Sequence, residues 1–315
     1  MISVVIPIYN EGELIHRLHK EVSEVMNALG RPWEVVYVND GSRDESLEIL
    51  LSKQRSDSHV VVVNLSRNWG HQAALTSGLS VARGEAIVMM DGDLQDPPTV
   101  IPAMISKWNE GWQVVVAERT SRAEGGLRAI LFPLFYKVLG FLSDYPIPLN
   151  AGIFGLLDRQ PLDAILNLTE TNRYLPGLRS WVGYRTTVVT YDRADRAEGE
   201  PKQTFWKLLK YGLDAIFSFS YKPLRLTLIM GLISAFLLAA FAVVLFFCRI
   251  RSIGLFGQPV VFGYTSTLIS ILFLGSAQLI GIGILGEYIG RIYDEVKRRP
   301  LFVIDKVYAA LPDEQ

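Results

Sequence analysis

Two long stretches without a charged residue constrain this chain more than any other feature. They cover residues 226–248 and 260–286 of the 315-residue sequence. A helix needs about 20 apolar residues to cross the ~30 Å hydrocarbon core of a bilayer, so either stretch is long enough. The alternative, a buried helix of a soluble core, is rare for uncharged runs of this length. We therefore predict two transmembrane helices joined by a short loop.

The charges around the two spans predict their orientation. Basic residues lie beside the spans at Lys222, Arg225, Arg291, Lys297, Arg298 and Arg299. Because cytoplasmic segments carry an excess of Lys and Arg, both termini are expected in the cytoplasm and the loop outside it, although Arg249 and Arg251 in the loop oppose this assignment. The N-terminus lacks a basic segment and reaches an acid at Glu11, so no signal peptide is expected there.

The first 120 residues alternate short apolar segments with helical patterns. Segments rich in Val and Ile predict strands at 2–9, 33–40, 59–66, 85–91 and 112–119. Apolar residues at helical spacing predict helices at 14–29, 44–54, 70–83 and from 99 onward. Asp44 is the expected N-cap of the second helix. This alternation, with apolar runs that are continuous, predicts an α/β fold with a mainly parallel sheet covered on both faces.

Polar residues follow each of the five predicted strands. In open parallel sheets, ligands bind beyond the carboxyl ends of the strands, so these residues are expected to form one site. They are Pro7, Tyr9, Asn10 and Glu11, then Asn39, Asp40, Gly41 and Ser42, then Ser66, Arg67 and Asn68, then Asp91, Asp93 and Gln95, and finally Glu118, Arg119 and Arg122.

The segment MMDGDLQDPP, after the fourth strand, has three carboxylates within six residues and ends in two prolines. No dinucleotide-binding pattern, G-x-G-x-x-G, follows the first predicted strand, and the P-loop pattern G-x-x-x-x-G-K-[ST] does not occur in the sequence. Four His and one Cys are too few for a zinc site. Asp91 and Asp93 instead suit Mg²⁺ or Mn²⁺ bound to phosphate oxygens, and solvated loop acids are the alternative. No basic stripe with interleaved aromatic residues occurs, so no nucleic-acid partner is expected.

Five motifs carry a resemblance to a known family: VVIPIYNE, VNDGSRDES, NLSRNWGHQAAL, MDGDLQDPP and GEYIGRIYDEVKRRP. The chain resembles the bacterial membrane-anchored polyprenyl-phosphate glycosyltransferases, the dolichol-phosphate-mannose-synthase-like branch of glycosyltransferase family 2. The resemblance covers nearly the whole chain. It implies a GT-A (Rossmann-like) cytoplasmic domain in residues 1–204, a nucleotide-sugar donor and a polyprenyl phosphate acceptor, usually undecaprenyl phosphate. It also implies a multi-pass protein of the inner (plasma) membrane.

The resemblance implies roles for the matching residues. Asp91 and Asp93 would hold the metal, Mg²⁺ or Mn²⁺, and would form the catalytic centre with Arg119. The residues implied in donor binding are Pro7, Tyr9, Asn10, Glu11, Asp40, Gly41, Ser42, Asp91, Gly92, Asp93 and Gln95. Within this set, Asp40 would accept a hydrogen bond from the base. Cations available for the acceptor phosphate are Arg67, Arg119, Arg122, Arg196 and Lys202, of which we expect at most three in the site.

The chain departs from the family pattern at two places. The family's G-D-F-R-L is AGIFGLLDR here, with Ile153 at the usual Asp, a common candidate for the catalytic base, and Gly155 at the usual Arg. A G-E-[ST]-K pattern appears as GEPK, with Pro201 in the hydroxyl position. A phosphate acceptor has its second pKa near ~6 and is already mostly anionic, so it needs cations rather than a base. We therefore still expect in-line attack of a phosphate oxygen on the anomeric carbon, with inversion.

Two further segments are expected near the membrane. Residues 127–142 and 205–223 combine apolar and basic residues, as interfacial helices do, although either could pack on the sheet instead. The transmembrane region would then be 224–290 and the cytoplasmic, partly extended tail 291–315. Small residues four apart, Gly286 and Gly290, allow close helix packing, and a homo-oligomer is expected.

The favoured function is transfer of a sugar from a UDP-linked donor, such as UDP-glucose, to polyprenyl phosphate for cell-envelope glycan modification. Asp40 fits the donor group of uracil without excluding other bases. A flippase or a downstream transferase would be the partner. One alternative is transfer to a glycan acceptor, against which the lack of a Q-x-x-R-W motif speaks. The other is a catalytically impaired nucleotide-sugar-binding membrane scaffold, supported by Ile153 and opposed by Asp91 and Asp93.

Overall fold

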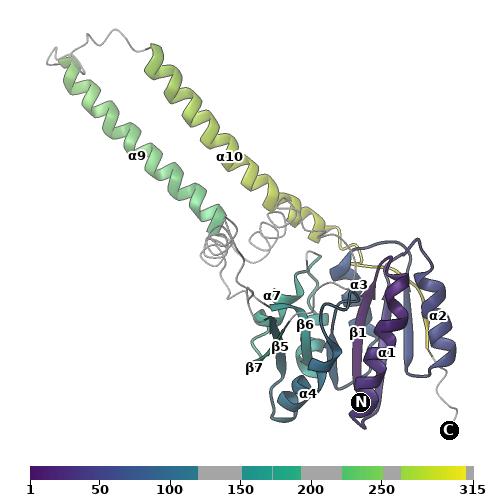
Figure 1. Cartoon of the computed structure of the whole chain (residues 1–315). Coiled ribbons are helices and arrows are strands. Elements are labelled where there is room, and N and C mark those ends of the chain that lie inside the picture. The colour runs from purple at the N-terminus through teal and green to yellow at the C-terminus, as the bar shows by residue number, and fades with distance from the viewer. Residues whose placement is uncertain (120–150, 172, 193–221, 251–263, 310–315) are drawn as a thin grey trace.

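The computed structural model describes residues 1–119, 151–171, 173–192, 222–250 and 264–309 (Figure 1). Within them, eight strands form one sheet in the order β7-β5-β6-β4-β1-β2-β3-β8. The strands are β1 (Ile2–Ile8), β2 (Trp33–Asn39), β3 (Val60–Leu65), β4 (Ala86–Met89), β5 (Val114–Arg119), β6 (Ala151–Asp158), β7 (Thr186–Tyr191) and β8 (Ile304–Tyr308). Strands β6 and β8 pair antiparallel with their neighbours, and the remaining pairs are parallel. The predicted α/β fold with a mainly parallel sheet is confirmed.

The helices that cover the sheet are α1 (Gly12–Ala28), α2 (Ser46–Ser56), α3 (His71–Val81), α4 (Ile101–Asn109, preceded by a 3-10 turn at Pro98–Val100), α6 (Arg159–Leu166) and α7 (Leu175–Trp181). The four helices and five strands expected in the first 120 residues are all present. The expected N-cap of α2 is wrong, because Glu45 takes that position. Asp44 instead accepts hydrogen bonds from the backbone N–H groups of Ser46 (3.1 Å) and Gly12 (3.2 Å), which ties the start of α2 to the start of α1.

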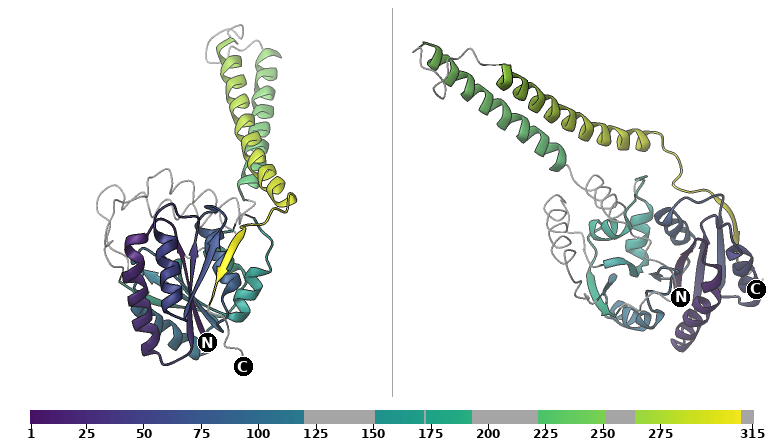
Figure 2. Two further views of the ribbon diagram at one scale, coloured as in Figure 1. Left: turned by 90° about the vertical axis from the view of Figure 1, so that its right-hand side faces the viewer. Right: turned by 45° about the horizontal axis from the view of Figure 1, so that its top comes forward.

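Both faces of the sheet are buried. Alternate residues of β1 and β2 enter two apolar clusters: Val4 and Val35 pack with α1, α2 and α4, whereas Val5 and Val36 pack with α3, α6 and α7. Figure 2 shows these helix layers on either side of the sheet. A strand buried on both faces needs apolar side chains at every position, which explains the continuous apolar runs of the sequence.

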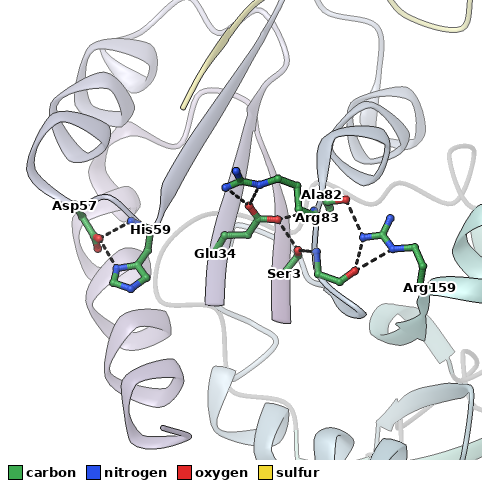
Figure 3. Close-up of polar contacts among 8 residues, drawn as sticks. Ser3, Glu34, Asp57, His59, Ala82, Arg83 and Arg159 are labelled. Atoms are coloured by element: carbon green, nitrogen blue, oxygen red, sulfur yellow. Dashed lines mark hydrogen bonds and ion pairs between the residues drawn. The ribbon is translucent and has the colours of Figure 1, made fainter. Parts of the chain in front are cut away.

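A polar network aligns the strands at their amino ends (Figure 3). The Glu34 carboxylate, only 2% exposed, accepts hydrogen bonds from Ser3 Oγ (2.6 Å) and from the backbone N–H of Arg83 (2.6 Å), and it pairs with the Arg83 side chain. Gly84 N–H donates to Ser3 Oγ (2.7 Å), and Arg159 Nε donates to the Gly84 carbonyl (3.0 Å). A Cβ at Gly84 would lie 2.6 Å from the Ser3 nitrogen. The turn before β4 is thus held against the start of β1, the strand with which β4 pairs.

Two long helices, α9 (Lys222–Ile250) and α10 (Tyr264–Val296), extend from the domain as a pair (Figure 1). Each contains a segment long and apolar enough to cross a membrane, Leu224–Phe241 and Phe273–Val296. Their apolar side chains are exposed, as at Phe236 (74%) and Leu279 (71%). Helices of a soluble core would be buried, so the two candidate membrane-spanning helices indicate membrane association. Helix α10 continues ten residues past residue 286, where the predicted second span ended.

The chain returns to the sheet after α10. Glu295, near the end of α10, accepts hydrogen bonds from the backbone N–H (2.7 Å) and hydroxyl (3.2 Å) of Thr171, between α6 and α7. The following segment forms β8 beside β3, so the tail expected to be partly extended contains an edge strand. The expected interfacial helix 127–142 and residues 205–221 of the second lie outside the described residues.

Candidate active site

The loops after β1 and β2 are interlocked by side chains predicted to bind the donor. The backbone N–H of Asn10 donates to Ser42 Oγ (3.1 Å), and Asn10 Oδ1 accepts from the backbone N–H of Arg43 (2.8 Å). Asn39 Oδ1 accepts from the backbone N–H of Ser42 (3.2 Å). Asn10 has φ of 53°, a conformation that Asn tolerates better than most residues. The structure thus brings the ends of β1 and β2 together, with Tyr9 exposed beside them.

Asp40 lies beneath the loop that follows β3. Its two carboxylate oxygens accept hydrogen bonds from the backbone N–H groups of Trp69 (2.7 Å) and Gly70 (3.1 Å). Burial raises the pKa of Asp40, and these two hydrogen bonds oppose the rise. In this structure Asp40 shapes the β3–α3 loop, and its contact with a nucleotide base stays a prediction.

Gly41 is the point where the loops after β2 and β3 meet. Its φ is +65°, and a Cβ there would lie 2.5 Å from the carbonyl carbon of Arg67 and from the nitrogen of Asn68. Both contacts are with backbone atoms, so a side chain at position 41 would push the loops apart. Only glycine permits this approach.

Gly92 places the acidic segment against the end of β1. A Cβ at Gly92 would lie 2.7 Å from Ile8 Cδ1 and 3.2 Å from the Pro7 carbonyl oxygen. The carboxylates on either side of it, Asp91 and Asp93, are partly exposed at the carboxyl edge of the sheet. The close packing of Gly92 against β1 therefore explains a glycine at this position. It also keeps Asp91 and Asp93 beside the predicted donor loops.

His71, the first residue of α3, contacts the acidic segment and was not predicted. Its Nε2 lies 2.8 Å from Asp91 Oδ1. Burial lowers the pKa of His71, but the hydrogen bond and charge of Asp91, together with the charges of Asp40 and Asp93, outweigh it and raise the pKa. Its position at the start of a helix, directly after the polar loop that follows the third strand, is the signal that could have identified it.

Arg119 belongs to a buried polar cluster with Asp96 and Tyr191. The Tyr191 hydroxyl donates to Asp96 Oδ1 (2.5 Å) and accepts from Arg119 Nε (3.1 Å), and Arg119 Nη2 lies 3.6 Å from the same carboxylate oxygen. Asp96 is 1% exposed. Burial raises the pKa of Asp96, the charges of Asp91 and Asp93 add to the rise, and the contacts with Tyr191 and Arg119 oppose it. The last residues of β5 and β7 and the loop after β4 thus meet at one point.

Of the other predicted cations, the structure describes Arg67 alone, which lies in the loop after β3. The Arg67 guanidinium lies 3.7 Å above the ring of Trp69 and donates to the Asn68 carbonyl (3.3 Å). Arg122, Arg196 and Lys202, and with them the GEPK segment, lie outside the described residues.

Packing explains the two residues of β6, Ile153 and Gly155, that depart from the family pattern. Ile153 packs with the apolar cluster on the face covered by α3, α6 and α7. A Cβ at Gly155 would lie 2.6 Å from the Val115 carbonyl oxygen and 2.9 Å from Arg179 Nη1. Arg179 is buried, donates from Nη2 to the Gly152 carbonyl (3.2 Å), and has its pKa lowered to about 10 by burial. A buried guanidinium from α7 therefore fills the space beside Gly155.

The residues at the acidic segment fit a divalent cation that is shared with a phosphate ligand. Among the described residues, no three carboxylate, imidazole or thiol groups converge as a complete metal site. Two hard carboxylates, Asp91 and Asp93, are the donor set with which Mg²⁺ is usually held, the remaining ligands being water and substrate phosphate oxygens. The electrostatics agree, because the negative charges of Asp91 and Asp93 help to raise the pKa of Asp96, and a bound cation would offset that repulsion.

The amino-acid sequence matches known proteins over its whole length. An uncharacterized glycosyltransferase of Synechocystis is 42% identical over 308 residues, covering 98% of this chain and 95% of that protein. The SfII prophage-derived bactoprenol glucosyl transferase of Shigella flexneri is 42% identical over 315 residues, covering 99% of each chain. The prophage bactoprenol glucosyl transferase homolog of Escherichia coli is 41% identical over 307 residues, covering 97% of this chain and 99% of that one.

Among solved structures, a mannosyltransferase of Pyrobaculum calidifontis in complex with GDP-Man and Mn²⁺ superposes with a TM-score of 0.46 at 20% identity, over 69% of this chain and 63% of that one. The family model described as glycosyl transferase family 2 matches residues 3–166, more than half of the chain. This match and the full-length relatives show that the chain belongs to glycosyl transferase family 2.

Proposed function

We propose that this protein transfers a glucosyl group from UDP-glucose to a polyprenyl phosphate at the cytoplasmic face of the membrane, with inversion. The observation that carries the proposal is the gathering of Asp91, Asp93 and Arg119 at one edge of the sheet. Strand β1 starts at the end of the domain far from α9 and α10, so this carboxyl edge faces the helix pair (Figure 1). The glucosyl group and the polyprenyl acceptor are supported by the names of full-length relatives, which are bactoprenol glucosyl transferases.

The donor would lie across the ends of β1, β2 and β4. The interlocked loops at Asn10 and Ser42 would hold the nucleoside, and Asp91 and Asp93 would hold Mg²⁺ or Mn²⁺ together with the diphosphate. When bound, the cation neutralises charge that develops on the departing nucleoside diphosphate. His71 would keep Asp91 oriented through its 2.8 Å contact.

The acceptor phosphate would bind beside Arg119. Tyr191 and Asp96 hold this side chain through the Nε hydrogen bond and the ion pair, and the guanidinium has five N–H donors in all, so it can also donate to a phosphate. A phosphate oxygen then attacks the anomeric carbon while the bond from that carbon to the diphosphate oxygen breaks. The attacking phosphate is already anionic at neutral pH, so no side chain has to remove a proton, and Ile153 is compatible with this chemistry.

The proposed topology has two spans and both termini in the cytoplasm. Strands β1 to β7, before α9, and strand β8, after α10, belong to one sheet. The chain must therefore return after α10 to the side of the membrane on which it began α9. We propose residues 1–204 as the catalytic domain, 205–223 as an interfacial helix, 224–290 as the transmembrane region and 291–315 as the tail.

The test is a product assay. Detergent-purified protein with Mg²⁺ or Mn²⁺ and undecaprenyl phosphate is incubated with UDP-glucose and a panel of other nucleotide sugars, and the lipid product is followed by mass spectrometry. We expect one glucosyl-phosphate lipid. Its formation should fall roughly 100-fold or more in Asp93→Asn, because a preorganised charge at the leaving group is lost.

Asp163→Asn is the matched control, since Asp163 lies on α6 and is exposed. This variant should retain activity. Full activity of Asp93→Asn would contradict the proposal. So would a product that forms with another nucleotide sugar and does not form with UDP-glucose. Metal-dependent nucleotide binding without any product would favour the membrane scaffold.

A further inference from the structure

We propose that strand β8, which follows the membrane helices, positions the donor-binding loops through the carboxylate of Asp305. The inference rests on the proposed function, which places the donor at the ends of β1 and β2. Asp305 is a positioning residue here, because it acts through other side chains and does not touch the donor.

A chain of hydrogen bonds leads from β8 across the ends of β3 and β2. Asn64 Nδ2 donates to Asp305 Oδ2 (3.0 Å), and Asn39 Nδ2 donates to Asn64 Oδ1 (2.8 Å). Asn39 Oδ1 accepts from the backbone N–H of Ser42 (3.2 Å), and Ser42 Oγ accepts from the backbone N–H of Asn10 (3.1 Å). The chain of contacts therefore ends in the two loops that would hold the nucleoside.

The carboxylate sets the direction of this chain. An ionised carboxylate only accepts hydrogen bonds, whereas an amide side chain can present either its oxygen or its NH₂ group. With Asp305 accepting, Asn64 must turn its NH₂ group toward β8 and its oxygen toward Asn39. Asn39 must then turn its NH₂ group toward Asn64, which leaves its oxygen to receive the Ser42 N–H.

The backbone of β8 puts Asp305 in place. Strand β8 pairs with β3 through Lys306↔Asn64 and Ile304↔Leu65, and a bulge lies between these two pairs. Asp305 is the extra residue at the bulge. Bulges re-aim side chains, which accounts for a carboxylate on an edge strand that reaches the amide of Asn64.

A second contact acts on the neighbouring loop. The backbone N–H of Ser66 donates to the Val303 carbonyl (3.0 Å), and Phe302 packs in the same apolar cluster as Trp69. The amide of Trp69 in turn holds Asp40. Strand β8 thus supports both the β2 loop and the β3 loop, and the donor site depends on a segment that follows both candidate membrane helices in the sequence.

The experiment compares Asp305→Ala, Asp305→Asn and the control Lys306→Ala in the full-length protein. We measure KM for UDP-glucose, KM for undecaprenyl phosphate, kcat, and Kd for UDP with Mg²⁺. Loss of one hydrogen-bonded anchor should raise the donor KM and the UDP Kd in Asp305→Ala about three- to tenfold. We expect kcat and the acceptor KM to change less than twofold. Asp305→Asn should recover most of the loss, because its oxygen can still accept from Asn64.

Lys306 is adjacent on the same strand, and its ammonium lies over the ring of Tyr308 (4.8 Å), so Lys306→Ala should match the wild type. Asn64→Ala and the double variant Asp305→Ala/Asn64→Ala should have the same donor KM, since both interrupt one chain of contacts. Hydrogen exchange of the peptide containing Ser42 should be faster in Asp305→Ala than in Lys306→Ala.

An unchanged donor KM with unchanged exchange at Ser42 would overturn the inference. So would a uniform loss, in which kcat, both KM values and the thermal midpoint all worsen, because that pattern means general destabilisation. The proposed function fails separately, if the wild type forms no glucosyl lipid and binds no UDP. In that case the exchange of the Ser42 peptide still decides the inference.

Discussion

Removal of one hydroxyl group, in Tyr191→Phe, tests the polar cluster around Arg119. This hydroxyl donates to Asp96 Oδ1 (2.5 Å) and accepts from Arg119 Nε (3.1 Å). The aromatic ring keeps its edge-to-face contact with Phe154, with centroids 5.4 Å apart, so the variant removes the hydrogen bonds and little of the packing. Asp96 would retain the Arg119 guanidinium at 3.6 Å as its charged neighbour.

The expected loss of unfolding free energy follows from the burial of Asp96. A hydrogen bond to a charged group contributes about 1.5–3 kcal/mol, and a carboxylate that is almost fully buried has no water to replace it. For a domain of this size, the loss corresponds to a decrease of the thermal midpoint of roughly 3–12 °C. Arg119 also loses the contact that orients it, so the KM for undecaprenyl phosphate should rise severalfold while the KM for the donor stays constant.

The loss of unfolding free energy in Tyr191→Phe should depend on pH, because it involves the ionisation of Asp96. Tyr191 holds down the pKa of Asp96, which burial raises, so the pKa rises further in Tyr191→Phe. At a pH above the folded-state pKa, Asp96 must ionise while it is buried, and a higher folded-state pKa then lowers the unfolding free energy. At a pH low enough for Asp96 to be protonated in both the folded and the unfolded state, this loss disappears. The difference between variant and wild type should therefore be largest near neutral pH and shrink toward pH 4, an expectation tied to the ordinary carboxyl pKa of 3.8.

The assay is thermal unfolding of metal-free protein in detergent at several pH values, combined with steady-state kinetics at neutral pH. Tyr184→Phe is the control, because the Tyr184 hydroxyl has no hydrogen-bond partner among the residues that the structure describes. Wild-type stability and acceptor KM in Tyr191→Phe would refute the reasoning. A stability loss of the same size at every pH would show that the charge of Asp96 is not its cause.

Two further predictions concern the sheet and its helices. Gly78→Ala should lower the unfolding free energy by about 1–3 kcal/mol in denaturant titrations, despite the better helix propensity of Ala. The reason is that the new Cβ would lie 2.5 Å from Val5 Cγ1 and 2.6 Å from Val38 Cγ2; unchanged stability would contradict this close packing. Burial, opposed by Asp57, lowers the pKa of His19 below its ordinary 6.5, so the stability it contributes is present above pH 6.5 and lost as the pH falls. His19→Gln should flatten the decrease in thermal midpoint between pH 7 and pH 5, and an equally steep profile would assign the decrease to other groups.

The first half of the sheet was predictable because its pattern is local. Residues such as Val4 and Val5 face opposite layers, and both layers are apolar, so each strand reads as a continuous apolar run. The later strands lack this signal. Strand β7 alternates exposed and half-buried residues until it ends at Tyr191, and β8 is an edge strand of five residues, so neither was predicted as a strand.

The candidate site was predictable in part. The positions of Asp91, Asp93 and Arg119 at strand ends followed from the order of strands. His71 and Tyr191 did not, because each reaches the acidic segment from an element whose place in the sheet is decided by distant contacts. Asp96 was visible as the third acid of its segment, but only the fold shows that it is buried and turned toward Arg119, while Asp91 and Asp93 stay partly exposed.

The sequence by itself determined the features that depend on neighbours along the chain. Two uncharged runs are long enough to span a bilayer, alternating strands and helices require a covered parallel sheet, and acids after a buried strand must lie at its edge. Only the tertiary structure decided which distant groups meet. Asn64 and Asp305 are 241 residues apart, with both candidate membrane helices between them, and no local pattern relates them. Hydrogen bonds of this kind form once the packed sheet has fixed the path of the backbone, and for that reason the role of the tail became visible only in the folded molecule.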